Sequence, residues 1–308
     1  QGGAPDQHAI YSLKEADVIV ALDANFLGEG PAQLRYSKDF GSRRRIDTTK
    51  TEQNRLYVAE PVPTITGAKA EHRLPVQAQL IHAVAASLAS AVGVAGAQGG
   101  SLSETAAAWV KAAAADLAAH KGKSAVIAGP HQPAVVHALA RAMNEALGNV
   151  GETVRYTAPV VASPVDGAAS ITELTQALNE GKVDLLLIID TNPVFTAPAN
   201  LKFKDAMQKA TTRIHLGLYH DDTAELCHWH IPAAHYLETW GDARAFDGTV
   251  SLIQPLISPI YDGRAAIEVI GAINGQIGRS PFELVKDFWT RAFDGQTNTK
   301  FVLRDASG

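Results

Sequence analysis

The sequence predicts an α/β protein with two doubly wound lobes whose sheets are mainly parallel. The clearest observation is the apolar run over residues 184–190, typical of a strand covered by helices on both faces. It ends in Asp190-Thr191-Asn192-Pro193, which favours a turn. A similar unit, residues 18–22 followed by Asp23-Ala24-Asn25, occurs earlier. Because ligands bind at the carboxyl ends of such strands, the chain predicts two crevices of a Rossmann-like, nucleotide-binding type.

Strands and helices alternate along the first hundred residues. A strand over 17–22 leads into a helix over 31–41, where Pro31 suits the first helical turn. A second strand is expected near residues 56–59. A helix near 75–92 follows, because apolar residues recur there at a spacing of four, which indicates a core-facing stripe. We interpret these elements as a first, partial lobe over residues 1–100.

The Gly-rich and Ser-rich segment 93–103 has the composition of a flexible linker, so a second lobe is expected over residues 101–275. It opens with an Ala-rich helix capped by Ser103. The elements that follow are expected at strand 124–129, helix 133–147, strand 153–156, helix 170–180, strand 184–190, helix 199–209 and strand 213–218. This alternation favours right-handed parallel crossovers. A loop-rich segment over 219–262 follows, and residues 276–308 are expected to form a helical tail.

Composition limits the function classes. The 308 residues carry a formal charge of -5 with a pI near 6.1, which argues against a nucleic-acid partner. The one basic cluster, Arg43-Arg44-Arg45, is interpreted as a solvated helix end, with an anion contact as the alternative. No apolar run reaches the roughly 18 residues of a membrane span, so no direct span is expected. Because the chain begins at Gln1, we expect a processed protein or a piece of a longer one.

The sequence predicts neither a catalytic centre nor a metal site. A single cysteine, Cys227, excludes an iron-sulfur cluster or a Cys-rich zinc site held by this chain alone. The histidines of the loop-rich segment have no diagnostic spacing, and alternation along a strand would place His228 and His230 on one face. Glu238 and Asp242 are expected to be exposed loop carboxylates rather than an acid/base pair. The other potential metal ligands of this segment are His220, Cys227 and His235.

The order of these motifs resembles the molybdopterin oxidoreductases of the dimethyl sulfoxide reductase and formate dehydrogenase type. Residues 16–25 and residues 184–193 are each similar to that family's strand followed by Gly-x-Asn-Pro. Residues 144–151 are similar to its Gly-Asn-x-Gly helix end. The segments 222–225, 231–242 and 247–250 are similar to its Thr-Ala, Leu-Pro, Glu and Gly-rich run. The resemblance covers most of residues 16–275 and implies two lobes like the family's central domains.

Several positions depart from the family pattern and predict a vestigial cofactor pocket. Asp23 and Phe26 replace a glycine and a proline, and Val62 stands where the family often has arginine. Residues 74–77 replace a Gly-Thr-Asp run that usually helps to hold the guanine nucleotide. No cofactor is therefore expected in this chain. The candidate residues of the vestigial pocket are Asp23, Asn25, Gly129, Asp190, Asn192 and Asp221.

This combination of retained family motifs and a vestigial cofactor pocket resembles the molybdopterin-oxidoreductase-like part of the iron-sulfur subunit of alternative complex III. That resemblance implies a noncatalytic scaffold in a quinol-oxidising respiratory complex. It further implies a periplasmic location, with membrane subunits and a ferredoxin-like iron-sulfur region of the same polypeptide as partners. The clusters would then lie outside these 308 residues.

Two other hypotheses remain open. The chain is alternatively a fragment of an active molybdenum or tungsten oxidoreductase, in which Asn25, Asn192, Asp190 and Asp221 would hold two molybdopterin dinucleotides. It is alternatively a binding module for a small nucleotide-type ligand. We expect no activity from this chain alone, and the flanking sequence would decide between an oxidoreductase and a scaffold.

Overall fold

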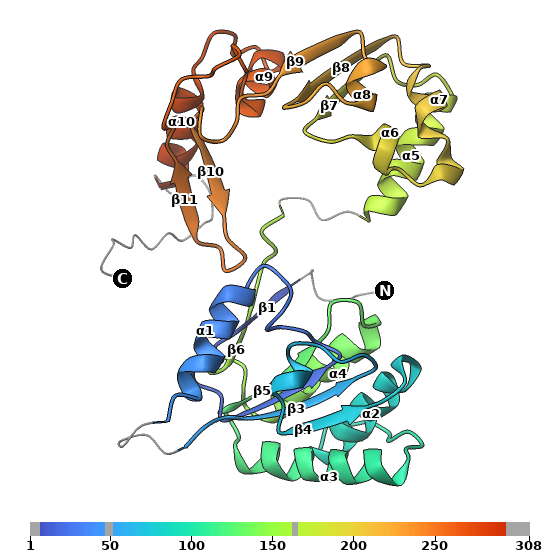
Figure 1. The fold of residues 1–308 in the computed structure, drawn as a ribbon, viewed down its shortest axis with the longest axis vertical. Coiled ribbons are helices and arrows are strands. Elements are labelled where there is room, and N and C mark those ends of the chain that lie inside the picture. The colour runs from blue at the N-terminus through green and yellow to red at the C-terminus, as the bar shows by residue number, and fades with distance from the viewer. Residues whose placement is uncertain (1–6, 47–51, 162–165, 294–308) are drawn as a thin grey trace. The chain divides into compact units, whose positions relative to one another are not determined.

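The computed structural model describes residues 7–46, 52–161 and 166–293. The chain divides into two compact units, Gln1–Val160 and Val161–Gly308, which we call unit 1 and unit 2 (Figure 1). Each unit contains its own parallel sheet with helices packed against it, so the predicted α/β class is confirmed.

The sheet of unit 1 has four parallel strands in the order β4-β3-β2-β5. Their bounds are His72–Pro75 for β4, Arg55–Glu60 for β3, Val18–Leu22 for β2 and Ser124–Ala128 for β5. Every residue of β2 is fully buried, because this strand has a neighbour on each side and cover on both faces. The apolar run 18–22 is therefore the central strand that its composition predicts.

Three helices share one hydrophobic core with a face of this sheet. They are α2 (Ile81–Ala91), α3 (Glu104–Ala119) and α4 (Ala134–Ala146). Of the apolar residues spaced by four, Val84 and Leu88 are fully buried in that core, as predicted, and Val92 packs against it. Leu80 precedes α2 and is exposed, so its predicted place in the core is wrong. The amide of Ala106 donates to Oγ of Ser103 at 3.3 Å, which confirms the predicted cap of α3. The remaining elements of unit 1 are α1 (Gln33–Arg43), the short turns η1 (Gly67–Lys69) and η2 (Ala78–Leu80), and the antiparallel pair β1 (His8–Tyr11) and β6 (Val154–Thr157).

The predicted lobe boundary near residue 100 differs from the boundary between the units. Strand β5 pairs with β2 in the first sheet, so residues 101–160 belong to unit 1. The expected linker over 93–103 stays within this unit, where the amide of Gly100 donates to Oγ of Ser87 on α2 at 3.0 Å. Composition predicts that each strand exists, but it does not say which strand lies beside which.

Unit 2 contains a three-stranded parallel sheet in the order β7-β8-β9. The strands are β7 (Leu185–Ile189), β8 (Thr212–Gly217) and β9 (Trp229–Pro232). The helical elements near it are α5 (Gly167–Asn179), α6 (Pro193–Thr196), η3 (Ala199–Leu201), α7 (Phe203–Met207) and α8 (Asp222–Glu225). Leu178, Ile188 and Met207 pack together in its core. An antiparallel hairpin and two helices follow, β10 (Gly241–Arg244), β11 (Val250–Ile253), α9 (Ala266–Ile273) and α10 (Pro281–Phe293).

Two expectations need correction at the level of elements, and a third can be compared only in part. The helix expected near 75–92 begins at Ile81, and residue 75, its expected start, lies in β4. The loop-rich segment 219–262 contains three short strands and α8. The expected helical tail over 276–308 includes α10, and residues 294–308 lie outside the described part of the chain. Short strands of four residues carry too few positions for a clear alternating pattern.

Candidate functional site

The order of strands places the crevice of unit 1 between β2 and β5. From β2 the chain moves to β3 and β4 on one side, and it then returns to place β5 on the other side of β2. Such a reversal of strand order opens a crevice at the carboxyl ends of the two central strands. Asp23 follows β2 directly and Gly129 follows β5 directly, so the structure brings these two predicted residues together. We call this crevice 1.

Side chains of the protein itself meet at crevice 1. The Oδ2 atom of Asp23 lies 2.7 Å from Nε2 of His131 and accepts a hydrogen bond from Nε2 of Gln132 at 2.8 Å. Asp23 is buried and has a φ of 52°, in the left-handed region that aspartate tolerates better than most residues. A Cβ atom at Gly129 would lie 1.9 Å from the carbonyl oxygen of Asp23. Glycine at 129 therefore permits the close approach of the two loops.

Asn25 is held by a buried threonine from the loop after β3. Its Oδ1 atom accepts a hydrogen bond from Oγ1 of Thr66 at 3.0 Å, and its Nδ2 atom donates to Glu29. Oγ1 of Thr66 in turn accepts the amide of Leu27 at 3.1 Å. The hydroxyl thus joins the side chain and the backbone of the Asn25 loop, and we call this arrangement the threonine clamp.

Unit 2 repeats the same arrangement at the carboxyl end of β7. Asp190 has a φ of 50°, and Oδ1 of Asn192 accepts a hydrogen bond from Oγ1 of Thr223 at 2.7 Å. The same Oγ1 atom accepts the amide of Val194 at 3.1 Å. These are the contacts that Asp23, Asn25, Thr66 and Leu27 make in unit 1. We call the polar edge around Asp190 and Asn192 crevice 2.

The repeat extends to the positions of the residues along the chain. Thr66 lies six residues after the end of β3 at Glu60, and Thr223 lies six residues after the end of β8 at Gly217. The amides of Asp23 and Asp190 each donate, at 2.8 Å, to the carbonyl oxygen of the penultimate residue of the neighbouring strand. Sequence reasoning compared the two Asp-x-Asn loops but missed both threonines. Their equal offset from the next strand is the signal that could have identified them.

Crevice 2 has an acidic border. Asp221 caps α8 by accepting the amides of Thr223 and Ala224, and Nδ2 of Asn192 lies 3.5 Å from Oδ2 of Asp222. A hollow of about 470 Å³ adjoins these groups. Its lining residues are Val194, Lys204, His220, Asp221, Asp222, Glu225 and Leu226. Three carboxylates thus line a space that contains a single lysine.

A buried ion pair stands at the end of β3. Glu60 is 1% exposed, and its Oε1 atom accepts a hydrogen bond from Nε of Arg73 at 2.6 Å. Oγ1 of Thr64 donates to the other oxygen at 2.6 Å. A Cβ at Gly67 would lie 1.8 Å from Oε1 of Glu60, so the glycine gives this carboxylate its room.

The other candidates of the sequence have local partners. Arg43 forms an ion pair with Asp17, and Arg44 forms one with Glu71 and bonds to Asn54. The guanidinium of Arg44 and the amide of Leu56 hold the pKa of Glu71 below its ordinary value, against the opposing effect of burial. The basic cluster therefore supports ion pairs within unit 1.

The structure does not place Glu238 and Asp242 in one hydrogen-bonded pair. Glu238 accepts the amides of His235 and Ile260, and Asp242 accepts Nε1 of Trp289. Cys227 is half-buried, and burial raises the pKa of its thiol. Among the described residues, no three His, Cys, Asp or Glu side chains are arranged to hold a metal ion.

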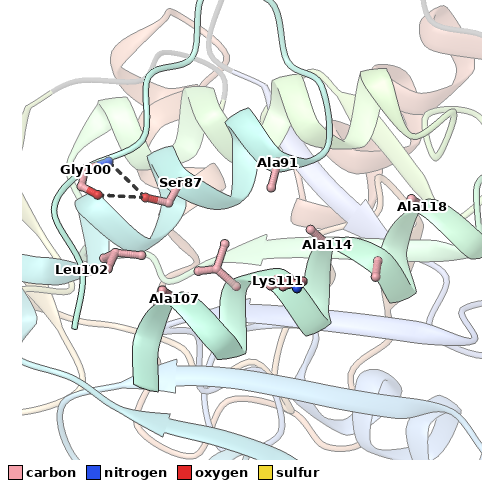
Figure 2. A pocket seen from close by; sticks show the side chains of 10 residues that line it. Ser87, Ala91, Gly100, Leu102, Ala107, Lys111, Ala114 and Ala118 are labelled. Carbon is pink, nitrogen blue, oxygen red and sulfur yellow. Dashed lines mark hydrogen bonds between the residues drawn. The ribbon is translucent and has the colours of Figure 1, made fainter. Parts of the chain in front are cut away.

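A second hollow, of about 560 Å³, lies between α2 and α3 (Figure 2). Figure 2 shows Ala91, Ala107 and Ala114 among its lining side chains, with Lys111 as the charged residue. Its walls are alanine-rich, and polar groups do not converge on it as they do at a typical ligand site. We therefore place the candidate functional site at the two crevices.

The threonine clamps lead to a first prediction. Thr66→Val and Thr223→Val are each expected to lower the free energy of unfolding of their own unit by about 2 kcal/mol. Each leaves a backbone amide without its acceptor and removes the hydroxyl that donates to the asparagine side chain. The Thr→Ser variants keep the hydroxyl and are the matched controls. Urea unfolding of all four variants tests this, and equal midpoints for valine and serine would contradict the clamp.

Comparison with known proteins identifies the family. A model of the family described as molybdopterin oxidoreductase matches residues 7–276. The chain belongs to the molybdopterin oxidoreductase family, as its motifs predict.

Two curated proteins are similar to parts of this chain. The chain is 25% identical to the menaquinone reductase, molybdopterin-binding-like subunit of Nitratidesulfovibrio vulgaris, over 87% of this chain and 44% of that protein. It is 31% identical to a nitrate reductase of Synechocystis sp. over 34% of this chain and 15% of that protein. The chain thus spans less than half of the curated relatives that it matches.

The fold also matches a solved structure. Acetylene hydratase from Pelobacter acetylenicus superposes with a TM-score of 0.60 at 13% identity, over 88% of this chain and 49% of that chain. At this identity the match supports the shared fold alone.

No helix in the described residues is long and apolar enough to cross a membrane.

Proposed function

We propose that this chain is a noncatalytic, molybdopterin-oxidoreductase-like scaffold within a respiratory electron-transfer complex. The observation that carries the proposal is the state of the two crevices, where the polar groups that could receive a cofactor bind one another. The family's intact members carry a molybdopterin-type cofactor, so its fit to each crevice is the central question.

Crevice 1 does not fit a phosphate-bearing dinucleotide. The carboxylate of Asp23 lies at the reversal of strand order, where the phosphates of the dinucleotide would approach the backbone. The amide of Asp23 donates to the carbonyl oxygen of Ala59, and the amide of Gly129 donates to that of Leu22, so both amides already have acceptors. A carboxylate without a bound cation repels phosphate, and engaged amides offer it no hydrogen bonds.

Crevice 2 does not fit a phosphate-bearing dinucleotide either. Asp221, Asp222 and Glu225 line the hollow beside Asn192, and Lys204 is the lysine that faces them. The amides at the start of α8 are capped by Asp221 and so are not offered to an anion. The excess of negative charge opposes the phosphates of a dinucleotide.

The relatives support the respiratory setting of this proposal. One matched protein is described as a molybdopterin-binding-like subunit of a menaquinone reductase, a name that places it in a multisubunit assembly acting on a quinone. We propose for this chain the quinol-oxidising setting of alternative complex III. Its partners would be membrane subunits and a ferredoxin-like region of the same polypeptide that holds iron-sulfur clusters, on the periplasmic side. In this setting the two units position the electron carriers rather than transfer electrons themselves.

Metal and pterin analysis of the purified full-length parent protein tests the proposal. We expect iron in stoichiometric amounts but neither molybdenum nor tungsten, and no pterin after oxidative release. A molybdenum enzyme purified from the same cells is the control for cofactor supply. Stoichiometric molybdenum or tungsten would overturn the scaffold and favour the active oxidoreductase, in which Asn25, Asn192, Asp190 and Asp221 face two dinucleotides.

A further inference from the structure

Two histidines of unit 2 form a pair that neither crevice uses. His215 on β8 and His230 on β9 are register partners, so their side chains lie on the same face of the sheet. Their Nδ1 atoms are 3.0 Å apart, and the rings are inclined by 21°. A Cβ at Gly217 would lie 2.5 Å from Cε1 of His215, so this glycine gives the ring its place.

The environment of the pair assigns its protons. His215 is 1% exposed, and its Nε2 atom is buried without a hydrogen-bond partner, 4.0 Å from Oδ1 of Asp221. A carboxylate at this distance favours a proton on Nε2 of His215 over a lone pair. Nδ1 of His215 is then the acceptor, so Nδ1 of His230 donates the shared proton. Nε2 of His230 is left as the basic atom of the pair.

We propose that His215 and His230 act as one proton-accepting unit, anchored at Asp221, that makes the edge of crevice 2 sensitive to mildly acidic pH. The pair accepts one proton at Nε2 of His230 while the shared hydrogen bond persists. A second proton would place a hydrogen on both Nδ1 atoms, and at 3.0 Å the two N–H groups would repel each other.

The groups around the pair favour its neutral state near neutral pH. The ring of His220 lies 5.3 Å from that of His230, and Glu225 lies 3.7 Å from His220. Burial lowers the pKa of His230 below its ordinary value, and the neighbouring His215 and His220 add to the effect while Asp221 opposes it. A lowered pKa means that the unfolded chain binds protons first on acidification. Unit 2 is therefore expected to lose stability as the pH falls through the ordinary histidine range.

Protonation of the pair would affect crevice 2 through Asp221. This residue caps α8, and Thr223 on α8 forms the clamp on Asn192. The positive charge that His230 gains on acidification attracts the nearby Asp221 carboxylate and competes with its hydrogen bonds to the amides of Thr223 and Ala224. Loss of that cap loosens α8 and with it the loop after β7.

Nitrogen NMR of the histidine side chains in the whole chain tests the inference. At about pH 7.5 we expect a proton on Nε2 of His215 and on Nδ1 of His230, and on acidification to about pH 5.5 we expect uptake at His230 first. Hydrogen exchange of the amides of α8 should show a loss of protection over the same range. Two independent titrations with ordinary pKa values would overturn the proposal.

A pair of variants separates the histidine pair from general acid effects. His230→Gln keeps an N–H donor for His215 but cannot take up a proton, so the acid-induced loss of protection in α8 should disappear. His82→Gln, at an exposed histidine of α2, should respond to acid as the unmodified chain does. An acid response retained in His230→Gln would contradict the inference. If that variant does not fold, the proton positions in the unmodified chain decide the question.

Discussion

Replacement of Gly129 by alanine is expected to destabilise unit 1 by about 3 kcal/mol or to prevent its folding, because the new Cβ overpacks the crevice. The Cβ would lie 1.9 Å from the carbonyl oxygen of Asp23, and backbone atoms cannot move aside as the end of a side chain can. The amide of Gly129 also donates to Leu22, so a shift of this loop would cost that hydrogen bond. Urea unfolding followed by circular dichroism measures the change.

Gly41→Ala is the matched control for this prediction. Gly41 lies in α1, and a Cβ there would meet nothing within 4 Å. Alanine at a helical position should leave stability unchanged or raise it by up to about 1 kcal/mol. Equal effects of the two substitutions would show that the close approach at Gly129 is not a constraint on the fold.

Arg73→Met is expected to lower the free energy of unfolding of unit 1 by about 3 kcal/mol, because it leaves a buried carboxylate without its cation. Glu60 is 1% exposed, and Thr64 would remain as its side-chain donor. Methionine keeps most of the length and the apolar stem of arginine, so the loss reports on the charge. The free energy of unfolding at neutral pH is the relevant measurement.

An exposed ion pair provides the comparison. Arg264 bonds to Glu268 at 3.2 Å with side chains 58% and 28% exposed, and Arg264→Met is expected to cost less than about 1 kcal/mol. A loss at Arg73 no larger than that at Arg264 would mean that Glu60 is stabilised by Thr64 and the surrounding amides rather than by the guanidinium. Glu60→Gln would then be expected to be nearly neutral.

Much of the fold could be predicted because buried parallel strands have a distinctive composition. The runs at 18–22 and 185–189 are apolar throughout, and both form strands. Both faces are covered in β2, as expected. In β7 the expected cover on both faces is wrong, because Leu186 and Ile188 are buried but Leu185 is 52% exposed. Helix α2 shows its buried stripe at a spacing of four, and α3 shows its cap at Ser103. Family membership was predicted from the order of short motifs and is confirmed by the match over residues 7–276.

The arrangement of the site could not be predicted in the same way. Residues 101–160 were assigned to the second lobe because strand composition does not reveal that β5 pairs with β2, far away in sequence. The partners of Asp23, at positions 131 and 132, follow from that pairing. His215 escaped notice because it lies inside the strand expected over 213–218, while the histidines considered as possible ligands cluster after residue 219. The vestigial nature of the pocket stays a prediction until the cofactor content of the parent is measured.

The threonine clamp has a consequence for how such a protein matures in the cell. Each Asp-x-Asn loop takes its shape from hydrogen bonds to a neighbouring loop of its own unit, so its geometry is complete when the polypeptide alone has folded. Under the proposed scaffold function, assembly would then require no step in which a cofactor is inserted. The folded loops alone would give the two units the shape with which they contact their partners.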